Sequence, residues 1–335
     1  MSFFKLITAN DYPKLSDKFS FIDPDDATKP FEPHYKTHIL PHVKIFELRR
    51  IEALNSLRKR TLVTIPIHII AVLFIVIYFS YTSFLIGFAI MGLVGYWTER
   101  AIRKYKASVK AEVFPEIFKF FGEDFQYSED SQLSMDLLGV SRIIPSYDNS
   151  YLEDYVKGSY KDVTMELTEA RLTEERGTGK NRRTVTVFNG IFILLEMNKN
   201  FLGLTVVKKD TGKRWDWFTK SKDLKNVKLE DPIFEKKFDV CSTDQVEARY
   251  LLTPSFMSRL LELSDIFSEY GQGVIQCSFY MNKLLLMIPS SKNRFEVGSI
   301  YQPATFVDDI NDILKEMAVL FQIIDILKLE QKTGL

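Results

Sequence analysis

The chain has 335 residues, with 44 Lys or Arg and 44 Asp or Glu side chains, so its formal net charge is zero. This balance excludes a nucleic-acid-binding protein that works through bulk positive charge. A content of 26% charged and 46% apolar residues is typical of a folded protein and excludes a disordered one. Two cysteines, Cys241 and Cys277, do not make a disulfide framework, so a reducing compartment is the simpler interpretation.

Residues 1–44 hold a stretch rich in proline and aspartate, and we expect an extended N-terminal tether there. His34, His38 and His42 recur at every fourth residue, a spacing that can place metal ligands on one helix face. Pro41 interrupts that helix, and no Cys or carboxylate completes a ligand set. We therefore favour a polar segment beside a membrane and expect neither a metal nor a cofactor.

Residues 45–60 are expected to form a basic amphipathic helix. Its apolar residues follow one another at three-residue steps, at Ile45, Leu48, Ile51, Leu54 and Leu57. A helix of this kind can lie in the headgroup plane of a bilayer.

Residues 61–97 contain no Asp, Glu, Lys or Arg, and an apolar stretch of this length is a transmembrane candidate. One straight helix of 37 residues would run roughly 55 Å, well beyond the ~30 Å of the hydrocarbon core. The polar cluster Ser80–Ser83 divides the stretch into two arms. We therefore predict a transmembrane helical hairpin that turns near these residues.

Basic residues flank both arms, and they decide the expected topology. A hairpin puts both flanks on one side, whereas a single tilted span, the alternative, would put one basic flank on each side of the membrane. Because basic flanks stay cytoplasmic, we expect the hairpin with both chain ends in the cytoplasm and anionic lipid headgroups as partners. The residues expected at the membrane surface are Arg58, Lys59, Arg60, Arg100, Arg103 and Lys104.

Two features inside the arms have a simple and a functional interpretation. Gly87, Gly92 and Gly95 allow close helix contacts, and packing of one arm on the other is the simpler explanation. His68 is an ionisable residue inside the first arm, which can mark function. Neither arm contains an acidic partner, so we favour an ordinary structural role for it.

After the membrane segment we expect a juxtamembrane helix over residues 98–122 and a cytoplasmic domain over residues 123–330. Alternating apolar and polar residues predict strands at 163–174 and 184–197, joined as a long hairpin, and a second hairpin follows over 276–289. Helices are expected at 255–270 and 304–329. The predicted class is α+β, with a mainly antiparallel sheet and flanking helices.

Three sequence motifs together resemble a bacterial family of unknown function, the domain of unknown function numbered thirty-one thirty-seven. They are Asp154-Tyr155-Val156-x-Gly158, Val187-Phe188-Asn189-Gly190-x-Phe192, and the run from Asp244-Gln245-Val246-Glu247 to Thr253-Pro254. The resemblance covers residues 100–330, although Asn189 departs from the small or basic residue expected there. It implies two transmembrane helices ahead of a soluble α+β domain in the bacterial cytoplasmic (inner) membrane, and it implies no activity.

The domain offers few residues for catalysis. All four histidines lie at or before residue 68, which removes Ser-His-Asp, Cys-His and His-ligated metal sites from the domain. The best candidate is a polar cluster of Asp244, Glu247 and Arg249. The two carboxylates could act as an acid and a base, or they could cap a helix and pair with Arg249.

Two apolar features suggest protein partners. Ile310, Met317, Leu320 and Ile324 follow a heptad pattern on the last helix, which either packs on the sheet or self-associates. Residues 215–218 place aromatic side chains on both faces of a predicted strand over 213–219. We therefore expect a membrane-tethered binding or scaffolding module, with an anchored enzyme that uses the Asp244 cluster as the alternative.

Overall fold

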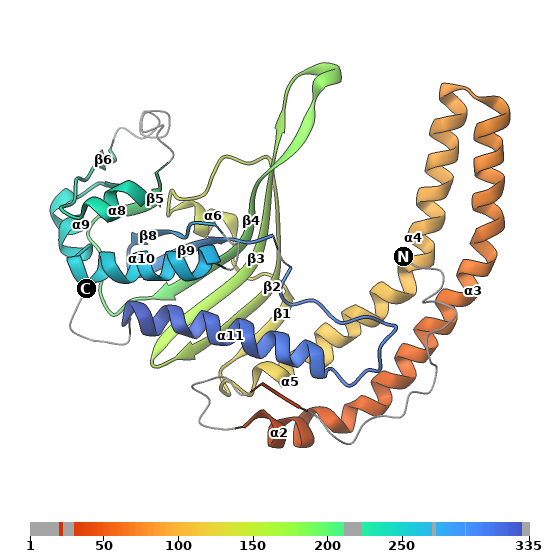
Figure 1. Ribbon diagram of the computed structural model, residues 1–335, viewed down its shortest axis with the longest axis horizontal. Helices are drawn as coiled ribbons and strands as arrows, with labels where there is room; N and C mark the ends of the chain where they lie inside the picture. Colours follow the sequence, from red (N-terminus) through yellow and green to blue (C-terminus); the bar gives the residue numbers. More distant parts are fainter. Residues whose placement is uncertain (1–19, 23–29, 211–222, 270–272, 292, 330–335) are drawn as a thin grey trace. The chain divides into compact units, whose positions relative to one another are not determined.

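A computed structural model describes residues 20–22, 30–210, 223–269, 273–291 and 293–329 (Figure 1). The chain divides into two compact units. The first unit comprises Met1–Phe120 with Glu296–Leu314, and the second comprises Phe121–Phe295 with Lys315–Leu335. The aromatic residues expected at 215–218, and the strand expected at 213–219, lie outside the described residues.

The first unit begins with helical turns that run without a break into a long helix. Helix α2 (Phe31–His34) continues through a π-helical turn, η1 (Tyr35–Ile39), into helix α3 (Leu40–Tyr78). Pro41 does not end this helix and lies directly after the π-helical turn, in the first turn of α3. The structure therefore differs from the prediction in two places. Residues 31–44 are helical rather than extended, and residues 45–60 are part of α3 rather than a separate helix.

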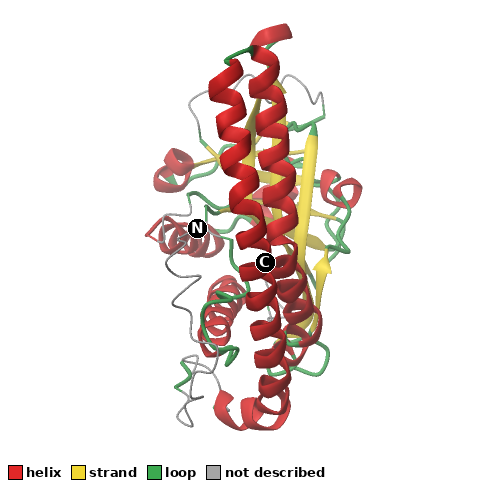
Figure 2. Ribbon diagram, turned by 90° about the vertical axis from the view of Figure 1, so that its right-hand side faces the viewer, coloured by secondary structure: helices red, strands yellow, loops and turns green. Residues whose placement is uncertain are grey.

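A tight turn joins α3 to helix α4 (Tyr81–Glu112). Ser80 caps α4 by accepting a hydrogen bond from the Ser83 N–H at 3.2 Å, and the Ser80 N–H donates to Ser83 Oγ at 2.9 Å. This capping box starts α4 within the polar cluster at which the turn was expected. The two helices run side by side in opposite directions (Figures 1 and 2).

One glycine sets the closest approach of the two helices. A Cβ atom on Gly87 would lie 2.4 Å from Cδ1 of Ile75, whereas Gly92 and Gly95 have no such neighbour within 4 Å. Close packing between the two helices therefore accounts for the glycine at position 87 but not for those at positions 92 and 95. His68 lies close to its own helix, with Nδ1 2.8 Å from the Thr64 carbonyl oxygen.

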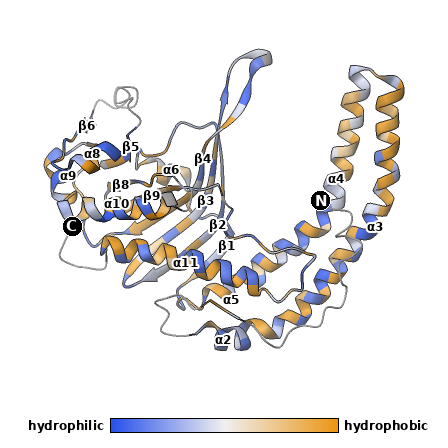
Figure 3. Ribbon diagram, viewed as in Figure 1, coloured by the Kyte–Doolittle hydropathy of each residue, from blue (hydrophilic) through white to orange (hydrophobic). Residues whose placement is uncertain are grey.

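Both helices are hydrophobic along the two arms, as the orange segments of Figure 3 show, and many of the apolar side chains between residues 62 and 97 are exposed. Examples are Leu62, Ile70 and Ile77 of α3 and Leu93 of α4. Only 11% of the most apolar window of the first helix and 17% of that of the second are buried. Each helix is long and apolar enough to cross a membrane.

The juxtamembrane segment contains two helices where the sequence predicted one. Helix α4 ends at Glu112, and a short helix α5 (Phe114–Phe118) follows with Pro115 in its first turn. Proline lacks the N–H that would continue α4, so the chain bends there. The side chains of Phe114, Ile117 and Phe118 are buried.

A buried ion pair anchors the segment 296–314 to α3. The Arg50 guanidinium donates to both carboxylate oxygens of Glu47, at 2.7 and 2.9 Å, and to the Ile300 carbonyl oxygen at 2.8 Å. Glu47 also accepts a hydrogen bond from the Ala304 N–H at 2.8 Å. Arg50, one of the basic residues that precede the first arm, is therefore a structural residue with only 1% of its surface exposed.

The second unit is built on one antiparallel sheet, which within the described residues has nine strands in the order β1-β2-β3-β4-β9-β8-β5-β7-β6. The strands are β1 (Gln126–Asp130), β2 (Asn149–Tyr160), β3 (Val163–Arg176), β4 (Arg183–Glu196), β5 (Thr205–Lys209), β6 (Lys225–Asn226), β7 (Phe238–Ser242), β8 (Gln276–Tyr280) and β9 (Lys283–Pro289). Strands β3 and β4 form the predicted long hairpin, and β8 and β9 form the second one. The predicted α+β class is confirmed.

Helices and short turns flank the sheet. They are α6 (Met135–Gly139), η2 (Gly179–Asn181), α8 (Pro232–Lys237), α9 (Gln245–Leu251), α10 (Pro254–Glu269) and α11 (Val307–Leu327), whose first residues belong to the first unit. On one face of the sheet, Phe256 of α10 packs against Phe279, and Phe321 of α11 stacks on Tyr160 at 4.2 Å. On the other face, Leu138 and other residues around α6 join a core cluster.

The heptad residues of α11 are buried. Ile310, Met317, Leu320 and Ile324 expose 2% of their surface or less. Their burial within the chain favours the packing interpretation over self-association through these side chains.

The buried ion pair gives the first test. Arg50→Met leaves the Glu47 carboxylate buried without its partner, and we expect this to lower the free energy of unfolding by about 3 kcal/mol or more. Arg49→Met is the matched control, since Arg49 pairs with Glu112 at the surface and should contribute ~1 kcal/mol or less. Thermal melts of the full chain in detergent compare the two variants. Equal melting temperatures would contradict the structural role of Arg50.

Candidate functional site

Asp244, the first residue of the predicted polar cluster, is a helix cap. It precedes α9, and its Oδ1 accepts hydrogen bonds from the N–H groups of Val246 at 2.9 Å and Glu247 at 3.0 Å. These donors have no partner within the helix, so the carboxylate satisfies two of the four free N–H groups of the first turn.

Glu247, the second residue of the cluster, holds a loop against α9. Its two carboxylate oxygens accept hydrogen bonds from the N–H groups of Leu202 at 2.9 Å and Gly203 at 2.7 Å. The loop comes close to the helix start, since a Cβ atom on Gly203 would lie 3.0 Å from Cβ of Asp244. Both carboxylates of the cluster thus bind backbone N–H groups.

Arg249 does not join the cluster. It is exposed, and its Nη1 donates to the Gln245 carbonyl oxygen of its own helix at 3.4 Å. Within the described residues, no ion pair connects it to either carboxylate. Residues two apart on a helix point in different directions, which explains why Arg249 does not face Glu247. The capping interpretation therefore describes Asp244, and the expected pairing with Arg249 is not formed.

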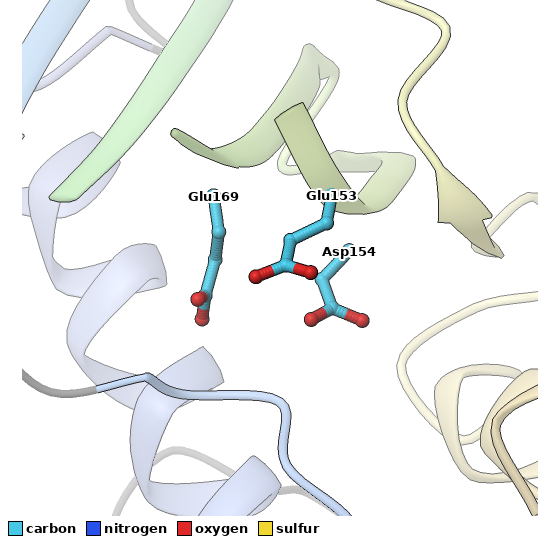
Figure 4. Close-up of side chains that lie close together, drawn as sticks. All are labelled: Glu153, Asp154 and Glu169. Carbon is cyan, nitrogen blue, oxygen red and sulfur yellow. The ribbon is translucent and has the colours of Figure 1, made fainter. Parts of the chain in front are cut away.

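A different set of carboxylates, Glu153, Asp154 and Glu169, lies close together on strands β2 and β3 (Figure 4). Each offers an oxygen atom within 4.8 Å of the others. Glu153 lies opposite Glu169 in the strand register, and the pairing shifts between Glu153 and Val156. This β-bulge gives Asp154 a φ of 52° and places it beside its neighbour instead of on the opposite face.

The carboxylate cluster is partly buried, which alters its protonation. Asp154 and Glu169 are buried, whereas Glu153 is exposed. The pKa of Glu169 is raised from 4.5 to about 7, mainly by burial and also by the charge of Asp154, and two backbone hydrogen bonds oppose this shift. The Tyr127 hydroxyl donates to Asp154, and burial beside that carboxylate raises the pKa of Tyr127.

Arg294 lies next to the carboxylate cluster. Its backbone N–H donates to Glu169 Oε1 at 2.6 Å, the Phe295 N–H donates to the same oxygen at 3.3 Å, and its guanidinium pairs with Glu316 of α11. Within the described residues, Nε and Nη2 of this arginine have no hydrogen-bond partner. Through these contacts, Glu169 and Arg294 connect the sheet, the loop at residues 294–295 and α11.

Chemically, the carboxylate cluster can hold a shared proton, and hard oxygen ligands of this kind can also hold a divalent cation. The cluster could not be predicted from local patterns, because Glu153 and Glu169 lie on different strands and meet only through strand pairing. One signal was present, since Asp154 opens the first of the three family-like motifs.

The basic residues expected at the membrane surface gather at the open end of the helix hairpin. Arg60 donates to the Trp97 carbonyl oxygen at 2.7 Å and lies over the Trp97 ring. Arg103 donates to the Tyr96 carbonyl oxygen at 2.6 Å and lies over the Tyr96 ring. The Arg60 contacts connect α3 to α4 where the apolar surface ends, whereas those of Arg103 lie within α4. Lys59, Arg100, Arg103 and Lys104 are exposed, and Arg58 and Arg60 are half-buried.

The helix cap formed by Asp244 and the loop hydrogen bonds that Glu247 accepts predict different effects of three substitutions. Asp244→Ala removes the cap of α9 and should lower the free energy of unfolding by about 1 kcal/mol. Glu247→Ala leaves two loop N–H groups without their acceptor and should cost about 1–3 kcal/mol. Arg249→Ala should change stability by less than ~0.5 kcal/mol. Melting temperatures of the full chain measure all three, and a large loss for Arg249→Ala would contradict this assignment.

The pKa of Glu169 predicts how stability depends on pH. The unfolded chain ionises this carboxyl near 4.5 and the folded chain near 7, so stability decreases as the pH rises through that window and is constant above it. Glu169→Gln keeps an oxygen acceptor and cannot ionise, so it should be more stable than the parent by up to about 3 kcal/mol at pH 8, and by less at pH 5. Glu196→Gln, at an exposed position, is the control. A pH-independent difference would contradict the buried, ionising carboxyl.

Comparisons with known proteins include a match to one family model. Among solved structures, the chain is similar to the crystal structure of the mycobacterial trehalose monomycolate transport factor A, with 14% sequence identity and a TM-score of 0.30, over 61% of this chain and 88% of that one. No curated protein matches the chain. Residues 186–329, which include the Asp244 run and α11, match the family model described as "Protein of unknown function (DUF3137)". This confirms the resemblance for the second and third motifs, and the first motif, at residues 154–158, lies outside the match.

Proposed function

We propose that the chain is a membrane-tethered binding module, anchored by α3 and α4. The observation that supports the anchor is the continuous exposure of apolar side chains on both helices. Isoleucine and leucine side chains such as Ile70 and Leu93 cost roughly 1.5–3 kcal/mol each when water rather than an apolar phase surrounds them. A bilayer covers such a surface, and each helix is long enough to span it.

The distribution of charge supports an orientation for the anchor. The six basic residues at 58–60 and 100–104 lie at one end of the hairpin, where Arg60 contacts Trp97. The turn at Phe79–Ser80 lies at the other end and carries no charge. Positive charge stays on the cytoplasmic side, so this orientation places both chain ends in the cytoplasm. The family resemblance favours the bacterial inner membrane.

An exposed apolar surface around α9 supports a binding role for the domain. Leu202 is 91% exposed and Val246 is 78% exposed, and Tyr250 lies one helical turn after Val246. Glu247 fixes the backbone of Leu202 beside the helix through the two hydrogen bonds described above. We call Leu202, Val246 and Tyr250 the α9 surface. Rigid, exposed apolar and aromatic groups of this kind are typical of protein-binding sites.

The charges beside the α9 surface indicate the chemistry of its partner. Lys199 lies over the Tyr250 ring at 4.2 Å, and Arg249 is exposed on the same helix. The nearby carboxylates of Asp244 and Glu247 accept backbone hydrogen bonds. The charged groups beside this apolar surface that are not turned toward backbone N–H groups, Lys199 and Arg249, are basic, and a protein segment with apolar and acidic side chains complements them.

The alternative function, an anchored enzyme that uses Asp244 and Glu247, has less support. Both carboxylates accept backbone hydrogen bonds that hold α9 and its loop. Arg249 does not face them, so the three residues do not form an acid–base constellation.

The anchor predicts the behaviour of the chain in membranes. It should remain in the membrane pellet after alkaline carbonate extraction, and reporters at residue 45 and at the C-terminus should both report cytoplasm. Replacing all six basic residues with Gln should give mixed orientation, because each contributes ~1 kcal/mol near anionic lipid. Release of the parent chain by carbonate, or an external C-terminus, would contradict the proposal.

The α9 surface predicts crosslinks to an acidic protein partner. A photoreactive amino acid at Val246 should give discrete protein adducts in cells, and the same group at Ile233, an exposed apolar residue of α8, serves as the control. Leu202→Asp should reduce the Val246 adduct about tenfold, and Lys199→Glu should reduce it further at low salt. Lipid adducts alone, or equal adducts at both positions, would contradict a protein-binding surface.

A further inference from the structure

One exposed stripe of helix α4 changes from apolar to basic along its length. Residues three and four positions apart lie on the same face of a helix. Exposed residues of α4 follow one another at alternating steps of four and three positions, at Ile86, Ile90, Leu93, Trp97, Arg100 and Lys104. The first three are aliphatic, the next is aromatic, and the last two are cationic. We call these residues the α4 stripe.

Trp97 lies where the stripe changes character, and α3 fixes its position. The Arg60 guanidinium donates to the Trp97 carbonyl oxygen at 2.7 Å and lies 4.9 Å from the centre of the Trp97 ring. Trp97 is nevertheless 43% exposed, so a ligand can reach it. A tryptophan between apolar and basic residues is typical of the boundary between hydrocarbon and lipid headgroups.

The two cations of the α4 stripe are free to bind an anion. Within the part of the chain that the structure describes, neither Arg100 nor Lys104 makes an ion pair or a side-chain hydrogen bond. Glu99, the acidic residue next to Arg100, pairs with Arg103 instead. Like charges four residues apart on a helix repel each other, so an anion bound between Arg100 and Lys104 would relieve this repulsion.

We infer that the α4 stripe binds one anionic phospholipid. The phosphate group contacts Arg100 and Lys104, and one acyl chain lies along the aliphatic part of the stripe. A phosphate accepts charge-assisted hydrogen bonds from both cations. The stripe contains no acidic side chain for the ammonium group of a zwitterionic lipid, so it favours a lipid with a net negative charge. This inference rests on the proposed membrane anchor, since the bilayer supplies the ligand.

The length of the aliphatic part favours a lipid over a free phosphate ion. Ile86 and Trp97 are separated by about 16 Å along a helix, which matches the ~15 Å of hydrocarbon in one leaflet. An acyl chain can therefore follow this part of the stripe while its phosphate reaches the two cations. A free phosphate ion would contact the cations and leave the aliphatic side chains uncovered.

Trp97 can report the lipid beside it, because brominated acyl chains quench tryptophan fluorescence on contact. The chain has three tryptophans, and Trp215→Phe with Trp217→Phe leaves Trp97 alone. This chain is reconstituted in vesicles of phosphatidylcholine and phosphatidylglycerol in which one lipid or the other is brominated. Quenching should show a preference of about tenfold or more for phosphatidylglycerol, since each cation at a membrane surface favours an anionic lipid about fivefold.

Two variants and a matched control test the residues of the site. Arg100→Gln and Lys104→Gln should each reduce the preference for phosphatidylglycerol about fivefold. Lys59→Gln removes an exposed cation of α3 that is adjacent in sequence to Arg60 and therefore points in another direction, so it should reduce the preference less than about twofold. An excess of inorganic phosphate at constant ionic strength should leave the preference unchanged.

The possible outcomes separate the lipid site from the anchor. Equal quenching by the two brominated lipids, equal effects of the three Gln variants, or loss of the preference in inorganic phosphate would overturn the lipid site, while the quenching itself would still support the anchor. No quenching by either brominated lipid would contradict the anchor and the site together. Melting temperatures verify that every variant is folded.

Discussion

The exposed apolar surface of α3 and α4 is the constraint on which the first unit depends. Two helices of 39 and 32 residues pack on each other through Gly87 and Ile75, yet most of their apolar side chains remain uncovered. An exposed apolar surface of this extent is unfavourable in water, and the proposed bilayer covers the part that the chain leaves exposed. The arginines that contact Trp97 and Tyr96 lie where the surface ends, as residues at a membrane interface do.

Acidic side chains that hold backbone N–H groups recur through both units. Glu47 binds the Ala304 N–H, Asp309 binds the Gly298 N–H, Glu169 binds those of residues 294 and 295, and Glu247 binds those of residues 202 and 203. In each case a loop without regular hydrogen bonds is fixed to a helix or a strand. A charged acceptor is suited to this task because its hydrogen bonds are stronger than those of a neutral one. Glu247, a carboxylate that suggested catalysis in the sequence, therefore has a structural role.

Much of the fold could be predicted from local patterns, and the site could not. The alternation at 163–174 predicted β3, and the absence of charge over 61–97 predicted the two apolar helices. Strands β1 and β2 were missed because the bulge at Asp154 breaks the alternation of β2. The sequence also suggested a pairing of Arg249 with Glu247 that helix geometry does not allow. The carboxylate cluster has no local signal beyond the motif that Asp154 opens, since strand pairing assembles it.

The central claim, that lipid covers α3 and α4, can be tested by spin-label accessibility in lipid vesicles. Single nitroxide labels would replace Leu62, Ile70 and Ile77 within the apolar stretch and Leu48 before the basic residues, all of them exposed. The proposal predicts frequent collisions with oxygen and few with a water-soluble nickel chelate, most clearly at Ile70, and the reverse at Leu48. Equal access of the nickel chelate to Ile70 and Leu48 would contradict it.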